Sequence, residues 1–429
     1  MKIRTFRIPS REAEAHLERL ARRSRSLFDG EASATAARAL DEIRRGGDRA
    51  LARWRKRYDG VTGPARARRR QARVSREFRL AFEESLRRLT AFHRLQKTRG
   101  AFLKIAGSRL EEQVVALDSA GVYIPGGEAP YVSTALMTIV PARIAGVPRI
   151  AVATPPSAYD GSSELRYALE RLRVSEVYRM GGAHAIAALA VGTRSVPRVA
   201  KIVGPGNRFV TAAKRLVSGL VGIDGLAGPT EVAIFADAAA DPERVAADLL
   251  AQAEHDAEAA ALLVTTSARL AERVEEALAR RLPLLSTRQR AGRSLARYGA
   301  IGIAASVPEA VAFLESFAPE HLGIQTRRSL ADAALFRRAG AIFAGGDSSE
   351  VFGDYVAGTN HVLPTNGTAR FASALSVRDF VRRMAVVSLS ARDAGSLAPR
   401  AETWARFEGL PGHGAAAALR RRGERGGKR

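Results

Sequence analysis

A carboxylate and an imidazole stand next to each other in the segment FAPEHLGIQ, as Glu320 and His321. Both side chains exchange protons in enzymes, and the pair follows a run of small and apolar residues. Such a pair could serve as acid and base at the edge of a strand, or it could be two polar residues on a solvated turn. The two residues alone do not decide between these interpretations.

A second group of polar side chains is predicted on one face of a helix in DPERVAADLLAQAEHDAEA. Asp241 is expected to cap this helix, and Pro242 to occupy its first position. Gln252 and His255 are three residues apart, so both should project from the side that carries the apolar residues. Either they form a hydrogen-bonded pair in the core, or they contribute to a metal site together with other ligands.

Further candidate ligands lie in two segments near the end of the chain. GDYVAGTNHVLPT contains Asp354 and His361, and FEGLPGHGAAAAL contains Glu408 and His413. The chain has no cysteine, which excludes disulfides, thiolate ligands and a cysteine nucleophile. Imidazole and oxygen ligands suit Zn²⁺ or a similar divalent ion, although Gln is an unusual zinc ligand. From the residues alone we infer a metal-dependent enzyme with a Glu–His pair, whose reaction is left open.

The elements that must position these residues follow from the hydrophobic pattern. The first hundred or so residues show apolar residues at three- and four-residue spacing, which predicts amphipathic helices. His16 and His93 fall among Arg and Glu in this part, so we expect them on solvated faces. From about residue 119, short apolar runs alternate with helical stretches, which predicts an α/β architecture with mainly parallel sheets. The predicted strands are AGVYIP, RIAVATPP, EVYRM, VAKIVG, EVAIFAD, ALLVTT, AIGIAAS and AIFAGG, with VSTALMTIVPARIAG as a crossover helix.

Three predicted turns are rich in Gly and Pro: YIPGGEAP (123–130), GPGNRFV (204–210) and FAGGDSSE (343–350). The first two stand between a strand and a helix, where main-chain N–H groups and the helix dipole favour anions. None contains GxGxxG, so the dinucleotide fingerprint is absent. Each turn alone is also explained as ordinary loop punctuation, whereas their clustering at strand ends indicates a cleft. A further Gly-rich segment, VGIDGLAGPTEV (221–232), is predicted to cross between two lobes.

The chain of 429 residues carries 68 Lys and Arg against 44 Asp and Glu, a net charge of +24. Arg is spread over the whole chain without an aromatic-interleaved basic strand or zinc-finger spacing, so a specific nucleic-acid function is not favoured. No apolar run reaches the roughly 18 residues that cross a bilayer, and the start has no apolar signal core. We therefore expect a cytoplasmic protein without a membrane partner. The basic tail RRRGERGGKR is expected to be disordered.

Taken together, these segments resemble the histidinol dehydrogenase family. The likeness extends over nearly the whole chain, and its carriers are GVYIPGG, RMGGAHAIAALAVGT, KIVGPGNRFVTAAKRLV, GIDGLAGPTEV, QAEHD, FAPEHL, GDYVAGTNHVLPT and EGLPGHGAA. The resemblance implies two incomplete Rossmann-like lobes, similar to aldehyde dehydrogenases, with small helical N- and C-terminal elements, which accounts for the missing fingerprint. We expect an N-terminal arm (1–20), a first lobe (21–122 with 232–376), a second lobe on the NAD side (123–231) and a C-terminal dimer-wrapping segment with the basic tail (377–429).

The resemblance implies oxidation of L-histidinol to L-histidine through L-histidinaldehyde, with two NAD reduced, as the last step of histidine biosynthesis. It also implies one Zn²⁺ per subunit and a homodimer with shared active sites. The zinc ligands would be Gln252, His255, Asp354 and His413, with His413 from the other subunit. The imidazole and amine of histidinol would complete the metal shell.

Matching positions of the family imply roles for the remaining candidates. His321 would take the alcohol proton as the first hydride leaves. Glu320 would then activate water to attack the aldehyde, a step that needs a base because the chain has no cysteine. Glu408 would meet the substrate amine or support the metal site. The implied substrate contacts are Thr230, Gln252, His255, His321, Asp354, Glu408 and His413.

Tyr123, His184 and Asn207 match cofactor-contacting positions, which assigns two of the glycine turns to NAD. Two positions depart from the commonest family pattern, since Thr230 stands where Ser is frequent and His184 where Gln is usual. These departures leave open a sister dehydrogenase that oxidises another small primary alcohol, such as a sulfonated diol. A basic nucleic-acid-binding protein on an enzyme scaffold is the more remote alternative, because it predicts a lost catalytic set.

Overall fold

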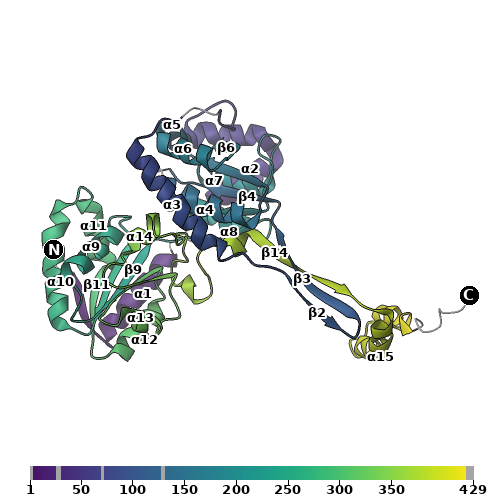
Figure 1. Cartoon of the computed structure of the whole chain (residues 1–429). Helices are drawn as coiled ribbons and strands as arrows, with labels where there is room; N and C mark the ends of the chain where they lie inside the picture. Colours follow the sequence, from purple (N-terminus) through teal and green to yellow (C-terminus); the bar gives the residue numbers. More distant parts are fainter. Residues whose placement is uncertain (1–2, 26–29, 69–71, 127–130, 422–429) are drawn as a thin grey trace, which may run out of the picture. The chain divides into compact units, whose positions relative to one another are not determined.

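The computed structural model describes residues 3–25, 30–68, 72–126 and 131–421. The chain divides into two compact units, one of residues 1–96 with 117–380 and one of residues 97–116 with 381–429. The larger unit contains two parallel sheets, each packed with helices (Figure 1). This confirms the predicted α/β class with mainly parallel sheets.

The first sheet has six parallel strands in the order β1-β11-β10-β9-β12-β13. Its side chains alternate between two cores, as the period of a strand requires. Val232 and Ile234 pack with α9, α10 and α11, whereas Ala233 and Phe235 pack with α1 and α12 on the other face. The strands are β1 (Arg4–Ile8), β9 (Glu231–Ala236), β10 (Ala260–Thr265), β11 (Ala300–Ala304), β12 (His321–Gln325) and β13 (Ala341–Ala344). The helices are α1 (Arg11–Arg25), α9 (Pro242–Ala253), α10 (Ala268–Arg281), α11 (Arg288–Tyr298), α12 (Val307–Phe317), α13 (Ser329–Ala333) and α14 (Glu350–Tyr355).

The second sheet has five parallel strands in the order β6-β5-β4-β7-β8. Ala151 and Ile202 pack with α2, α7 and α8, whereas Val152 and Val203 pack with α3, α4 and α6 on the other face. The strands are β4 (Ser119–Tyr123), β5 (Arg149–Thr154), β6 (Glu176–Arg179), β7 (Lys201–Val203) and β8 (Gly222–Ile223). The helices are α2 (Gly30–Trp54), α3 (Arg76–Arg94), α4 (Val132–Ala145), α5 (Pro156–Gly161), α6 (Ser163–Arg171), α7 (Gly182–Val191) and α8 (Arg208–Val217).

In each sheet the order in which strands are added switches from one side of a central strand to the other. From β9 the chain adds β10 and β11 on one side and β12 and β13 on the other, and β4 has the same position between β5 and β7. In α/β proteins such switch points open a crevice at the carboxyl ends of the strands, where ligands bind. Glu320 and Thr230 do not lie at that edge, because they directly precede β12 and β9 and are therefore at the amino ends of two paired strands.

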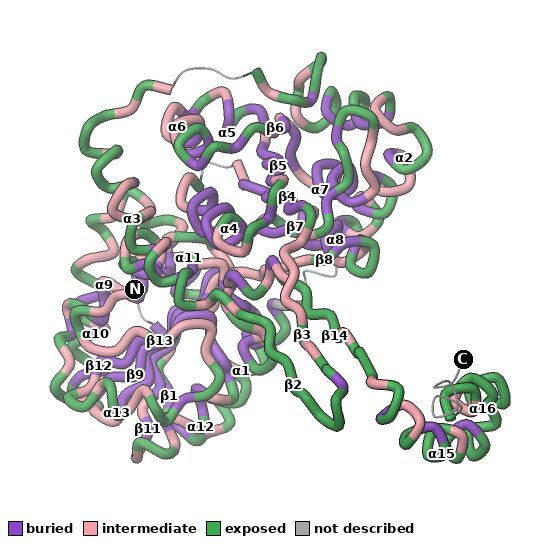
Figure 2. The backbone as a smooth tube through the Cα atoms, turned by 45° about the vertical axis from the view of Figure 1, so that its right-hand side comes forward, coloured by how far each residue is buried: buried purple, intermediate pink, exposed green. Residues whose placement is uncertain are grey.

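The smaller unit is an antiparallel sheet followed by two helices. Its strands β2 (Ala101–Ile105), β3 (Ser108–Ala116) and β14 (Val381–Ser388) pair in the order β14-β3-β2. The helices α15 (Ala391–Phe407) and α16 (Pro411–Ala418) pack on each other. Figure 2 shows that most of this unit is exposed, in contrast to the buried strands of the two parallel sheets. The sequence pattern did not predict this antiparallel sheet.

Every strand predicted from the sequence is present, and so is the crossover helix, as α4. The segment 221–232 does connect the two sheets, because it runs from β8 to β9. The predicted boundaries differ from the observed packing at three places. The expected N-terminal arm contributes β1 to the first sheet, α2 and α3 pack on the second sheet, and β4 begins at Ser119 in that sheet. The part of the tail from residue 422 onward lies outside the described residues.

Two histidines expected on solvated faces are buried, so that prediction was wrong. His16 packs against Phe6, and burial together with Arg4 and Arg19 lowers its pKa to about 4. His93 bonds through Nδ1 to the carbonyl of Leu89, and its Nε2 accepts from the amide of Asn360 at 3.2 Å. Their polar sequence neighbours lie on the opposite faces of the same helices, which is why the local pattern misled.

In the described part of the chain, no helix combines the length and the hydrophobicity that a membrane crossing requires.

Candidate active site

Glu320 and His321 stand where α12 gives way to β12. The helix ends at Phe317, and Ala318 turns the chain with a φ of 52° before the strand begins at His321. Glu320 is 7% exposed and His321 is 4% exposed. The pair is therefore a buried acid and base at a strand end, and the alternative of a solvated turn is wrong.

The main chain of Glu231 in β9 bonds both of these side chains. Its N–H donates to Glu320 Oε2 at 2.9 Å, and its carbonyl accepts from His321 Nδ1 at 3.0 Å. Since a carbonyl only accepts, the ring proton of neutral His321 resides on Nδ1 and the lone pair on Nε2. Within the described residues Nε2 has no hydrogen-bond partner, and Asp354 Oδ1 lies 3.5 Å away. That nitrogen is the atom available to take a proton.

Thr230 connects the Glu–His pair to the helix α9. Its hydroxyl donates to Glu320 Oε2 at 2.5 Å and accepts from the side-chain amide of Gln252 at 2.8 Å. Asp241 caps α9 and Pro242 opens it, as predicted, and Gln252 lies buried in its last turn. Because Gln252 bonds Thr230 through Nε2, its amide oxygen is available to bind another group.

Charges at the site depend on one another because Glu320 and His321 are buried and lie beside the partly buried Asp354. Burial raises the pKa of Glu320, against the stabilising effect of His321 and of the bonds from Thr230 and Glu231. Burial alone would lower the pKa of His321, but Glu320 and Asp354 outweigh it and raise this pKa to about 10. Burial would raise the pKa of Asp354, yet the closeness and charge of His321 lower it below its usual range. The arrangement thus favours a charged Asp354.

Two further imidazoles surround Asp354. The charges of His255 and His361 both favour its ionised form, so both rings lie within electrostatic reach of the carboxylate. The Nδ1 of His255 bonds to the carbonyl of Ala251 at 2.9 Å, and the Nδ1 of His361 bonds to the carbonyl of Asp354 at 2.9 Å. Each bond leaves an Nε2 lone pair for another partner, as in histidines that bind metals.

The predicted ligands of the larger unit fit a divalent cation by their chemistry. His255 offers an imidazole nitrogen, Gln252 an amide oxygen and Asp354 a carboxylate. Within the described residues, no group of three or more His, Asp or Glu side chains could hold a metal ion.

The predicted residues of the smaller unit are accessible. Glu408 ends α15, and His413 lies in the first half of α16, with both side chains exposed. An exposed imidazole is available to another molecule.

The predicted cofactor residues lie at the carboxyl edge of the second sheet. Tyr123 ends β4, and its hydroxyl accepts from the N–H of Gly182 at the start of α7 at 3.0 Å. Burial raises the pKa of Tyr123 to about 12. His184 is buried in the first turn of α7, where its Nε2 donates to Asp59 at 2.8 Å. Tyr123 and His184 therefore meet at one helix end.

Asn207 caps the next helix of this edge, α8. Its Oδ1 accepts from the N–H groups of Phe209 and Val210 at 3.1 and 3.2 Å, which leaves its exposed amide group free of that role. The preceding Gly204 has a φ of 111°, and an added Cβ would lie 2.1 Å from the carbonyl oxygen of Tyr123. Only glycine fits there. Residues 127–130 of the first predicted turn lie outside the described residues.

Three contributions to these sites were missed from the sequence. Glu231 acts through its main chain, which carries no residue signature. Asp59 accepts from Gly181 N–H and from His184 although it is more than a hundred residues away in sequence. Lys214 is a buried cation that donates to the carbonyl of Gly204 at 2.7 Å and pairs with Asp224, whose carboxylate accepts from the N–H of Gly204.

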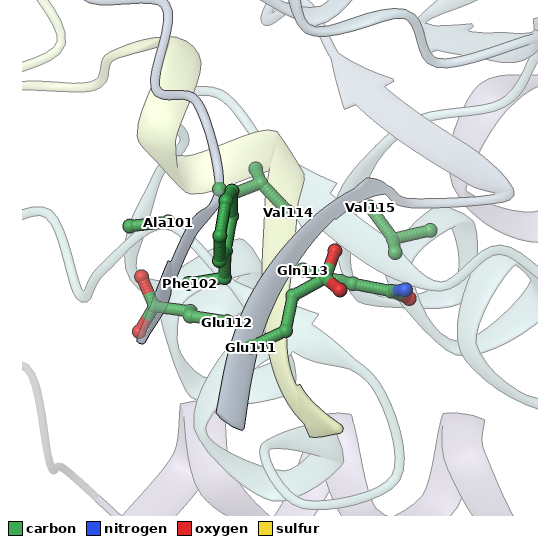
Figure 3. Close-up of a pocket in the computed structure, with 8 residues that line it drawn as sticks. Ala101, Phe102, Glu111, Glu112, Gln113, Val114 and Val115 are labelled. Carbon is green, nitrogen blue, oxygen red and sulfur yellow. The ribbon is translucent and has the colours of Figure 1, made fainter. Parts of the chain in front are cut away.

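A surface pocket of about 380 Å³ lies on β2 and β3 of the smaller unit (Figure 3). Its walls include Phe102, Glu111 and Gln113. None of the predicted site residues lines it, and it is not part of the site described above.

Comparison with known proteins is consistent across sequence and structure. Residues 22–421 match the family model described as histidinol dehydrogenase. The chain is 44% identical over 414 residues to a histidinol dehydrogenase of Thermus thermophilus, which covers 95% of this chain and 99% of that protein. It is 42% identical over 390 residues to one of Geobacillus kaustophilus, covering 89% and 92%.

A crystal structure of histidinol dehydrogenase from Elizabethkingia anophelis superimposes with a TM-score of 0.89 at 30% identity, over 97% of this chain and 98% of that one. The match therefore includes the smaller unit as well as the two lobes. The chain belongs to the histidinol dehydrogenase family and is an oxidoreductase.

Proposed function

We propose that the protein oxidises L-histidinol to L-histidine through L-histidinaldehyde, with two NAD reduced, as the last step of histidine biosynthesis. The observation that carries this proposal is the buried Glu320–His321 pair. Its two members are bonded to one residue, and the free Nε2 of His321 is next to Asp354. Family membership supplies the substrate, and the pair supplies the two proton transfers that a four-electron oxidation requires.

His321 performs the first proton transfer. Its Nδ1 is held by the Glu231 carbonyl, so Nε2 takes the proton of the substrate alcohol as the first hydride departs. NAD, when bound, accepts that hydride. The carboxylates of Glu320 and Asp354 favour the imidazolium, which is why they raise the pKa of His321 to about 10. Zn²⁺ bound to Asp354 would offset the charge of that carboxylate and so favour the neutral ring that accepts the proton.

Glu320 performs the second proton transfer. Burial raises the pKa of this carboxyl group, which makes the carboxylate a stronger base than an exposed one. It withdraws a proton from water as the water attacks the aldehyde carbon. The gem-diolate anion formed then loses the second hydride, which the second NAD would accept, and becomes the carboxylic acid, which releases its proton to solvent. Thr230 and the N–H of Glu231 orient the carboxylate for this step.

Gln252, His255 and Asp354, with His413 from a second subunit, would hold Zn²⁺. The ion would supply a fixed site for the imidazole and amine of histidinol and would orient the alcohol carbon. Glu408 would meet the substrate amine. Tyr123, His184 and Asn207 would contact NAD at the carboxyl edge of the second sheet.

Exposed apolar side chains of the smaller unit support a homodimer with shared active sites. Several large residues there are more than half exposed, which is unusual for a surface without a partner. They are Phe102, Leu103, Ile105, Val387, Trp404, Phe407 and Leu419. In such a dimer, His413 of each subunit would reach the metal site of the other subunit.

The test is the formation of NADH from NAD and L-histidinol, with the histidine produced counted against it. Two NADH per histidine, lost on chelation and restored by Zn²⁺, would support the proposal. A folded, zinc-loaded protein without activity on histidinol would contradict it. Activity on a sulfonated diol instead would favour the sister dehydrogenase and direct attention to Thr230 and His184.

A further inference from the structure

Glu231 occupies a central position that no motif indicated. Its N–H bonds Glu320 at 2.9 Å and its carbonyl bonds His321 at 3.0 Å. One residue thus places the base of the aldehyde step and the base of the alcohol step. Any displacement of its main chain would move both bases.

The side chain of Glu231 is held by Arg23 of α1. The two form an ion pair whose side chains are 1% and 0% exposed. Arg23 also donates to the carbonyl of Glu258 at 2.5 Å. Glu231 opens β9 and is paired in register with Ala260, which opens β10. Arg23 therefore links the amino ends of two neighbouring strands, one of which carries the residue that bonds both bases.

Stability alone does not account for charges at this position. Burial of an ion pair has a desolvation cost that an apolar pair of similar volume avoids, and such replacements are often neutral or stabilising. An Arg–carboxylate pair, however, provides directional hydrogen bonds, which apolar packing does not. The ion pair of Arg23 and Glu231 therefore serves to hold Glu231 in a defined position.

We propose that Arg23 and Glu231 are positioning residues for both proton transfers. Their ion pair fixes the main chain of Glu231 where it orients Glu320 and accepts the hydrogen bond from Nδ1 of His321. The effect on rates rests on the proposed function, whereas the effect on the hydrogen bond of His321 does not require a substrate.

The test is the double variant R23M/E231L, which replaces the ion pair with apolar side chains. It should melt within a few degrees of the parent protein, because no buried charge is left unpaired. We expect kcat to fall about 10- to 100-fold in both half-reactions, since displacement of a reacting group by about 1 Å costs about 100-fold. The KM for NAD should not change. Histidinol and histidinaldehyde, used separately, report the two half-reactions.

The matched control is R149M/E176L. Arg149 and Glu176 form a partly buried pair at the start of β5 and β6 in the second sheet, and neither residue bonds Glu320 or His321. This variant should keep the kcat of the parent protein in both half-reactions. A comparable loss in the control would show that any broken strand-end pair lowers the rate, which would overturn a specific role for Arg23 and Glu231.

A spectroscopic measurement on metal-free protein separates this proposal from the proposed function. In protein labelled with ¹⁵N-histidine, the Nδ1–H of His321, identified by its absence in His321→Asn, should exchange slowly with water, because Nδ1 bears a proton and donates to the Glu231 carbonyl whether the ring is neutral or charged. R23M/E231L should make this signal exchange faster. If the parent protein is silent with histidinol but the variant shows this change, the result would contradict the proposed function and support the positioning role.

Parent-like kcat in both half-reactions, or an unchanged His321 signal, would overturn the positioning role. A loss confined to the aldehyde step would overturn it as well, because only Glu320 would then be affected. If the double variant does not fold, Arg23→Lys provides the same comparison, since it keeps the charge but changes the bonding geometry.

Discussion

Thr230→Val should weaken the aldehyde step while the fold persists. Valine has the shape of threonine without the hydroxyl, so Glu320 loses a bond of 2.5 Å and the amide of Gln252 loses its acceptor at 2.8 Å. A hydrogen bond to a charged group contributes about 1.5–3 kcal/mol, and an unpaired buried amide costs about 1–3 kcal/mol. Since water can replace part of both, we expect a decrease of about 2–4 kcal/mol in the free energy of unfolding.

The rate effect follows from the same bond. Without the hydroxyl the ionised form of Glu320 is less stable, so the pKa of its carboxyl group rises further above its usual range. The base is then protonated at higher pH, and the acid limb of the pH profile for aldehyde oxidation moves upward. On that limb, a loss of about 1.5–3 kcal/mol corresponds to a rate decrease of about 10- to 100-fold.

The assay is NADH formation from histidinaldehyde across the pH range, together with thermal or urea unfolding. Thr230→Ser is the matched control, because it keeps the hydroxyl and loses only a methyl group, worth about 0.8 kcal/mol. The serine variant should keep the pH profile of the parent protein. Identical profiles for the valine and serine variants would refute the reasoning that the hydroxyl stabilises the Glu320 carboxylate.

Three further changes test other parts of the site. Glu320→Gln should slow aldehyde oxidation by about 10²–10⁴-fold, the usual contribution of a general base, and leave the first NADH largely intact; normal histidine production would remove Glu320 from this role. His413→Ala should abolish zinc retention, measured by metal analysis after dialysis. A mixed dimer of two subunits that are inactivated at different sites should regain partial activity if His413 binds the metal of the other subunit. No regained activity in well-formed heterodimers would argue for ligation within one chain. Lys214→Met leaves the buried Asp224 without its ion-pair partner, so the free energy of unfolding should fall by about 3–5 kcal/mol. The variant should also raise the KM for NAD more than it lowers kcat. An unchanged KM for NAD would show that this ion pair does not contribute to cofactor binding.

The sequence allowed prediction of the elements that depend on local pattern. The strands around residues 119–344 are apolar runs between turn formers, and the cap of α9 by Asp241 follows from residue type alone. Residue types also identified Glu320 and His321 as a proton-transfer pair. Their burial was not predictable, because it comes from β9, about ninety residues earlier in the chain.

The remaining features depend on contacts between distant residues. The main chain of Glu231 bonds both bases, but any residue type has an N–H and a carbonyl, so the sequence contains no signal for this role. His93 looked solvated because its partner Asn360 lies far along the chain. Asp59 was not singled out for the same reason, since the N–H that it accepts belongs to Gly181.

The position of Thr230 and Glu320 at the amino ends of β9 and β12 affects how the protein can be altered. Strands of six and five residues are about 20 and about 17 Å long, so the connections that follow the carboxyl ends of β9 and β12 begin about that far from Thr230 and Glu320. The turn at residues 237–241 is one such connection, and it leads directly into α9. A reporter peptide inserted there would lie at the carboxyl edge of the sheet, away from Thr230 and Glu320 at the amino edge. This turn is therefore a suitable site for a fluorescent or affinity label that leaves turnover intact.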